Sequence, residues 1–169
     1  HADNAAPALL GGVVASADDR SLVVPLRLDP AIVVWIPSFA TRTDQSRAAL
    51  PATVSRADAV FNIGRTALLV AALAAGDPSE LAHATADRLH QPVRFAAAPA
   101  SHEAYQAAIA AGAWCAWLSG SGPTVAAMCA LDRADHIAAQ IAARLPDGGH
   151  TKVLRIDHEG ASLTAQQPA

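Results

Sequence analysis

Two short apolar runs joined by a glycine-rich loop constrain the fold of this chain more than any other feature. Residues 113–118 and 124–130 are each too short for a typical helix, and Ser-Gly-Ser-Gly lies between them at positions 119–122. Short apolar runs bounded by turn residues are typical of buried strands. The pattern therefore predicts two neighbouring strands connected by a tight loop.

Helical patterns flank these two strands on both sides. We predict one helix over residues 101–111 and another that begins at Asp132 and continues to Leu145. Residues 152–157 and 162–164 predict a final hairpin. The order helix–strand–strand–helix–strand is that of a ferredoxin-like α+β sandwich.

The first half of the chain predicts three strands and then a long helix. After a helical turn at residues 5–10, the strands are expected at 13–16, 22–28 and 31–37, rich in Val, Ile and Leu. The long helix is expected from Ser55, a capping residue, to about residue 75.

Three shorter segments complete the prediction. Thr41 or Thr43 can cap a short helix through Leu50, and Asp77 can begin another short helix. We expect residues 90–94 to be irregular, because Pro92 prevents a helix from continuing through this segment.

Composition sets limits on the function. The 169 residues carry a net charge of −3, so no basic surplus favours nucleic acid or an anionic membrane as partner. A hydrophobic content of 52% with 16% charged residues excludes disorder, and no run of about 18 uninterrupted apolar residues predicts a membrane span. Cys115 and Cys129 match no metal spacing, so we expect no metal site and a reducing cytosol.

The glycine-rich loop can bring backbone N–H groups close to an anion, because glycine has no Cβ. Three well-known motifs do not fit it. A dinucleotide fingerprint needs a third glycine where Val125 stands, and a P-loop needs a lysine, whereas Lys152 is the one lysine of the chain. A nucleophile elbow needs glycines two residues to either side of a serine, which neither Ser119 nor Ser121 has. A plain tight turn between strands stays open as the alternative.

Three segments together resemble the second half of homoserine kinases, within the galactokinase, homoserine, mevalonate and phosphomevalonate kinase superfamily. They are His-Ala-Asp-Asn at residues 1–4, Arg-Leu-His-Gln-Pro-Val-Arg at 88–94 and Ser-Gly-Ser-Gly-Pro-Thr at 119–124. They occur in the order and spacing of that family, and the similarity extends to about residue 130.

The resemblance implies ATP-dependent phosphorylation of the L-homoserine hydroxyl, which gives O-phospho-L-homoserine in threonine biosynthesis. Phosphoryl transfer depends mainly on positioning, so no general base is expected. An arginine can hold the substrate carboxylate through two parallel hydrogen bonds. The residues that the resemblance implicates are His1, Arg47, Arg94 and Gly120 in substrate binding, and Thr43, Ser119, Ser121 and Gly122 in orienting or supporting them.

The same resemblance implies that a larger protein is needed for activity. These kinases hold ATP and Mg²⁺ mainly in an N-terminal half, through a Gly-Leu-Gly-Ser-Ser loop that this sequence does not contain. We expect residues 1–28 to be a junction with that half and residues 29–169 to be the C-terminal, substrate-side domain. The implied partners are L-homoserine, the N-terminal half and a possible second copy in a homodimer, in the cytoplasm, and the chain alone is expected to be inactive.

Two other functions stay open from the sequence. A stand-alone amino-acid-binding or regulatory module could keep the same arginines without catalysis. A sister kinase of the superfamily could act on another small alcohol, although the segment at residues 88–94 argues against it.

Overall fold

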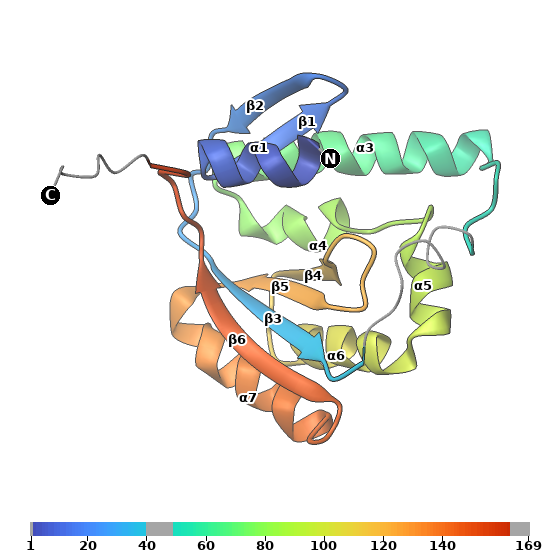
Figure 1. Cartoon of the computed structure of the whole chain (residues 1–169), viewed down its shortest axis with the longest axis vertical. Helices are drawn as coiled ribbons and strands as arrows, with labels where there is room; N and C mark the ends of the chain where they lie inside the picture. The colour runs from blue at the N-terminus through green and yellow to red at the C-terminus, as the bar shows by residue number, and fades with distance from the viewer. Residues whose placement is uncertain (1, 40–48, 163–169) are drawn as a thin grey trace, which may run out of the picture.

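The computed structural model describes residues 2–39 and 49–162 (Figure 1). Its main sheet is antiparallel and has the strand order β4-β5-β3-β6. This order, with helices between β3 and β4 and between β5 and β6, confirms the ferredoxin-like α+β arrangement. The strands are β3 (Ala31–Pro37), β4 (Cys115–Leu118), β5 (Val125–Cys129) and β6 (Gly149–Arg155).

Helices lie on both faces of this sheet. In Figure 1, α6 and α7 cover the lower face, whereas α3 and α4 lie above the sheet. The short helix α5 stands beside the glycine-rich loop, at the end of the sheet. The helices are α3 (Arg56–Ala75), α4 (Leu81–Ala84), α5 (Gln91–Ala97), α6 (Pro99–Ala110) and α7 (Ala134–Arg144), with single 3₁₀ turns at Pro78–Glu80 and Leu131–Arg133.

The N-terminal segment forms a separate unit against α3. Helix α1 (Ala2–Leu10) precedes a two-stranded antiparallel sheet of β1 (Val13–Ala17) and β2 (Arg20–Val24). The predicted strand at 22–28 is therefore wrong in its bounds, because it pairs only as far as Val24, where the β1 register ends.

The core follows from alternation along β3. Val33 and Trp35 are at most 1% exposed and face α7, where Ile137 and Ile141 are equally buried. The opposite face of the sheet carries a second, smaller cluster, which includes Leu73 of α3. Burial on both faces explains why β3, β4 and β5 contain so few polar residues.

The long helix has the ends that its sequence predicts. At its start, Ser55 Oγ accepts a hydrogen bond from the backbone N–H of Asp58 at 3.0 Å. At its end, Gly76 has a φ of +75°, and a Cβ there would lie 2.7 Å from the backbone oxygen of Arg27.

Two predictions of local structure are wrong. Residues 91–97 form helix α5, because Pro92 lies in the first turn, where its missing N–H has no helical partner to lose. The final hairpin does not form as predicted, since β6 pairs with β3 and Ser162 lies outside any strand; residues 163–164 lie outside the described residues. The helix predicted before Leu50 falls mostly on residues 40–48, which are also outside them.

Candidate active site

The glycine-rich loop connects β4 to β5 as a tight, hydrogen-bonded turn. The backbone N–H of Ser119 donates to the carbonyl of Thr124 at 2.9 Å, and that of Gly122 donates to the carbonyl of Ser119 at 3.0 Å. Gly120 has a φ of +57°, a conformation that costs other residues about 1 kcal/mol or more. A Cβ at Gly120 would meet no atom of the described residues within 4 Å, so this part of the chain leaves the tip of the loop open.

A buried serine on α6 holds the far side of this loop. Ser101 is fully buried, and its hydroxyl donates to the carbonyl of Pro123 at 2.6 Å. Ser101 was not among the predicted site residues, because a serine in an alanine-rich helix carries no motif. Its hydrogen bond fixes the loop against the helix that covers the sheet.

Arg94 meets the tip of the loop from α5. Its Nη1 donates to the carbonyl oxygen of Gly120 at 3.1 Å and lies 3.2 Å from Nδ1 of His90. The two contacts use one nitrogen, and Nε is buried without a hydrogen-bond partner among the described residues. The structure thus brings together Arg94 and Gly120, two of the predicted substrate-binding residues, across 26 positions of sequence.

The position of α5 depends on the carboxylate of Asp87. Oδ2 accepts backbone hydrogen bonds from Leu89, His90 and Gln91 at 3.1, 2.8 and 2.7 Å, and Oδ1 accepts one from Nδ2 of Asn62 at 2.6 Å. Burial raises the pKa of this carboxyl, but the donors outweigh it, so the pKa of Asp87 lies below its ordinary value. As an ionised carboxylate, Asp87 therefore accepts from the first N–H group of α5, that of Gln91, and from the two N–H groups that precede the helix.

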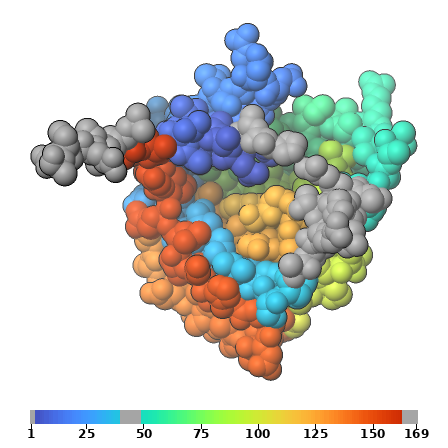
Figure 2. Space-filling view, in the orientation of Figure 1, coloured from blue at the N-terminus to red at the C-terminus, as the bar shows by residue number. Residues whose placement is uncertain are grey.

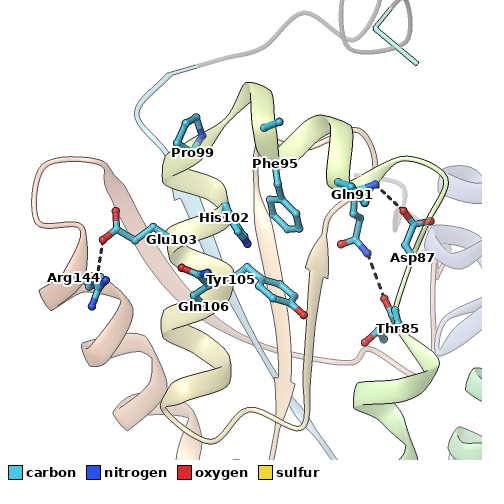
Figure 3. Close-up of a pocket in the computed structure, with 13 residues that line it drawn as sticks. Thr85, Asp87, Gln91, Phe95, Pro99, His102, Glu103, Tyr105, Gln106 and Arg144 are labelled. Carbon is cyan, nitrogen blue, oxygen red and sulfur yellow. Dashed lines mark hydrogen bonds and ion pairs between the residues drawn. The ribbon is translucent and has the colours of Figure 1, made fainter. Parts of the chain in front are cut away.

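Gln91 connects α5 to the end of β4. Its Oε1 accepts from the backbone N–H of Leu118 at 2.9 Å, and its Nε2 donates to the carbonyl of Thr85 at 3.3 Å. Figure 3 shows Gln91 and Phe95 on the side of α5 that faces a cavity of about 820 Å³, next to His102 on α6. Arg94, one residue before Phe95, contacts the glycine-rich loop, and His90, one residue before Gln91, contacts Arg94.

The loop belongs to a recessed part of the surface. In Figure 2 the light-orange residues of β4, β5 and their loop reach the surface between the blue N-terminal elements above and the cyan β3 below. Ser119 and Gly120 are exposed there, whereas Ser121 and Gly122 are half-buried.

Three predicted site residues, His1, Thr43 and Arg47, lie outside the described residues. The structure tests neither their positions nor their roles. Conversely, Asn62, Asp87 and His90 support the site and were not predicted individually, although Asp87 and His90 lie beside or in the segment 88–94, which carries the family resemblance.

A known protein family matches the part of the chain that contains the candidate site. The family described as "GHMP kinases C terminal" matches residues 69–147, which include α5, α6, the glycine-rich loop and α7. Residues 69–147 form a GHMP kinase C-terminal domain. This domain contains both Arg94 and Gly120, so their contact lies within the matched region.

The chain as a whole is related to homoserine kinases. It is 50% identical over 133 residues to the homoserine kinase of Moorella thermoacetica, covering 76% of this chain and 45% of that protein. It is 45% identical over 150 residues to that of Gloeobacter violaceus, covering 87% of this chain and 50% of that protein. The chain thus spans about half the length of the curated relatives it matches.

A solved structure confirms the GHMP kinase fold beyond the matched domain. The homoserine kinase of Cytophaga hutchinsonii superimposes with a TM-score of 0.89 at 27% identity, covering 95% of this chain and 53% of that one. The coverage includes most of the N-terminal hairpin unit as well as the ferredoxin-like part.

Proposed function

We propose that this chain is the C-terminal half of a homoserine kinase, which transfers the γ-phosphoryl group of ATP to the side-chain hydroxyl of L-homoserine. The observation that carries this proposal is the contact between Arg94 and the Gly120 carbonyl, 3.1 Å apart. It places a permanent cation beside an open loop tip that a small zwitterion can approach. The related homoserine kinases supply the class of reaction.

In this proposal Arg94 binds the substrate carboxylate. Arg47 would supply a second guanidinium, His1 would hydrogen-bond the polar end of the substrate, and Thr43 would orient Arg47. The half-buried Arg94 gives a stronger hydrogen bond to a carboxylate than an exposed arginine would, because water competes less for it. No residue is assigned as a general base, since alignment of the hydroxyl with the γ-phosphate is the main requirement.

ATP and Mg²⁺ are assigned to the other half of the enzyme. Among residues 2–39 and 49–162, no group of three His, Cys, Asp or Glu side chains could hold a metal ion. The glycine-rich loop also has no lysine beside it to contact phosphates. The residues described here therefore do not fit a complete nucleotide site, and we derive no step through one.

The outer surface of α3 fits a second polypeptide unit. This helix is long and apolar enough, by length and composition, to cross a membrane, and only 11% of its most apolar window is buried. Val60 and Ile63 are 60% and 70% exposed, and Leu9 and Leu22 of the hairpin unit are 64% and 76% exposed. We assign this surface to the N-terminal half, with residues 1–28 as the junction, because patches of this kind mark interaction sites.

Polar contacts argue for a protein partner of α3 over lipid. The guanidinium groups of Arg65 and Arg88 lie 4.5 and 3.9 Å from the centre of the Phe61 ring, and Asn62 bonds Asp87. An ionisable group in a hydrocarbon layer is costly. Together with the two free, buried cysteines, this supports a cytoplasmic enzyme.

The experiment joins this chain behind the N-terminal half of the Moorella thermoacetica homoserine kinase; we call the product the joined enzyme. We expect ADP formation that depends on L-homoserine, and none from the 169-residue chain alone. Binding of L-homoserine without transfer by the joined enzyme would favour the amino-acid-binding module instead. Turnover by the chain alone would contradict the need for the other half.

A further inference from the structure

His90 lies between a carboxylate and the guanidinium of the proposed substrate site. Its Nε2 is 3.8 Å from Oδ1 of Asp87, and its Nδ1 is 3.2 Å from Nη1 of Arg94. The imidazole therefore separates the buried anion from the permanent cation, with one ring nitrogen facing each of them.

This geometry selects one protonation state of the ring. Arg94 has only donors, so Nδ1 of His90 makes a hydrogen bond with Nη1 only when it carries no proton. The single proton of the neutral imidazole then lies on Nε2, on the side of Asp87. A doubly protonated ring would turn an N–H toward the guanidinium and replace the hydrogen bond by repulsion.

We propose that neutral His90 is a positioning residue, which holds Arg94 against the Gly120 carbonyl in the orientation that receives the substrate carboxylate, and that protonation of His90 releases Arg94. The proposal rests on the proposed function, because it takes Arg94 as the substrate-binding arginine. It adds a pH-dependent control of that residue, which no motif in the sequence indicates.

The charges around His90 support a neutral ring at pH 7. Burial lowers the pKa of His90, the Asp87 carboxylate raises it and Arg94 lowers it again, with a net result below the ordinary value of about 6.5. From α3, Arg65 lines the same cavity of about 470 Å³ as His90 and Asp87. Among the described residues, Asp87 and Arg94 are the charged groups that shift the pKa of His90. The side chain is 34% exposed, so protons from solvent can reach it.

The first test is a nuclear magnetic resonance titration of the 169-residue chain. Near pH 7.5, long-range ¹H–¹⁵N spectra should show Nε2 protonated and Nδ1 unprotonated. As the pH falls below 6.5, His90 should titrate and the Arg94 side-chain resonance should shift with the same midpoint. His83→Asn, a change at a 73% exposed histidine on α4, is the control variant, in which Arg94 should behave as in the parent chain. A proton on Nδ1 of His90 at neutral pH would overturn the proposal. An Arg94 resonance that does not shift while His90 titrates would also overturn it.

The second test compares two substitutions in the joined enzyme. His90→Asn keeps an acceptor near the position of Nδ1, whereas His90→Gln keeps a donor near the position of Nε2 and loses the acceptor. We expect His90→Gln to raise the KM for L-homoserine about 10-fold with kcat nearly unchanged. A change of this size corresponds to the loss of one hydrogen bond to a charged group, here the Arg94 guanidinium. The KM of His90→Asn for L-homoserine should stay within about 3-fold of the parent value. The proposal also predicts that the parent KM rises at low pH, and His90→Asn should abolish this rise, because the asparagine has no ring to protonate.

The outcomes separate this inference from the proposed function. Equal effects of the two substitutions, or an effect on kcat alone, would assign His90 a purely structural role and overturn the inference while the kinase function stands. A joined enzyme that does not act on L-homoserine overturns the proposed function and the substrate role of His90 together. The titration of the chain alone still decides whether His90 and Arg94 are coupled.

Discussion

Asn62 on α3 and Asp87 before α5 form a hydrogen bond of 2.6 Å between Nδ2 and Oδ1. The Oδ1 atom of Asn62 in turn accepts from the backbone N–H of Arg88 at 3.0 Å. One amide side chain thus binds both the carboxylate and the backbone of the turn that begins α5. Since α5 carries Arg94, this pair of side chains connects the long helix with the proposed substrate site.

Removal of the Arg94 guanidinium should weaken substrate binding selectively. In the joined enzyme, Arg94→Ala should raise the KM for L-homoserine about 10- to 100-fold, because the substrate carboxylate loses its hydrogen bonds to the guanidinium. The KM for ATP should change less than about 3-fold. Steady-state kinetics measure both constants, and Arg144→Ala, which removes an exposed arginine paired with Glu103, is the control. Equal changes in the two KM values would contradict the role of Arg94 in homoserine binding.

Loss of the Asp87 charge should destabilise the chain. Asp87→Asn replaces a carboxylate that accepts four hydrogen bonds by an amide. The amide NH₂ group would then face N–H groups that also donate, so we expect the free energy of unfolding to fall by about 1–3 kcal/mol. Urea unfolding of the 169-residue chain measures this free energy. Asp147→Asn, at an exposed turn, should change it by less than about 0.5 kcal/mol. Two equally stable variants would show that Asp87 is not needed to begin α5.

The pH dependence of stability should reveal the same carboxylate. Because the pKa of Asp87 is lower in the folded chain than its ordinary value of about 3.9, the unfolded chain binds more protons below about pH 5. Its contribution to stability is present above that range and is lost as the pH falls through the folded pKa. Urea midpoints between pH 7 and pH 3 should therefore fall less steeply for Asp87→Asn than for the parent chain. Parallel curves would argue against an ionised Asp87 in the fold.

Cys115 should be unreactive in the folded chain. It is 1% exposed on β4, and burial raises the pKa of its thiol to about 11, so almost no thiolate forms at pH 8. A disulfide reagent added at pH 8 should modify Cys115 only when the chain unfolds, as mass spectrometry of native and urea-treated samples would show. Rapid modification of the native chain would mean that β4 opens far more readily than its burial implies.

Polar substitutions on the exposed face of α3 should impair association with the N-terminal half and leave folding intact. The double substitution Val60→Ser and Ile63→Ser removes side chains that the described chain leaves mostly exposed, so the free energy of unfolding should change by less than about 1 kcal/mol. Binding to a separately expressed N-terminal half, measured by calorimetry, should weaken at least 10-fold. Ile109→Ser, at a 38% exposed position on α6, is the control. Unchanged binding would place the interface elsewhere.

Local sequence predicted much of the fold. Ser55 and Gly76 predicted the ends of α3, because a side-chain cap and a left-handed residue act within one helical turn. The glycine-rich loop predicted a tight connection between β4 and β5, since positive φ angles require glycine. Pro92 was interpreted wrongly for a related reason: proline excludes a helix interior but favours a first turn, and only the position of α5 decides between them.

The sequence by itself determined the class of fold, because periodicity, caps and turn residues act over a few neighbouring positions. Its resemblance to homoserine kinases predicted which segments belong to the site. Only the tertiary structure decided that the Arg94 guanidinium contacts Gly120, that Asn62 of α3 binds Asp87 and that Gln91 contacts the backbone of β4. These contacts depend on how α3, α5 and β4 pack together. Hydrogen bonds between residues about 25 positions apart leave no periodic trace in the sequence, since their distances are set by the packing of the whole sheet and its helices.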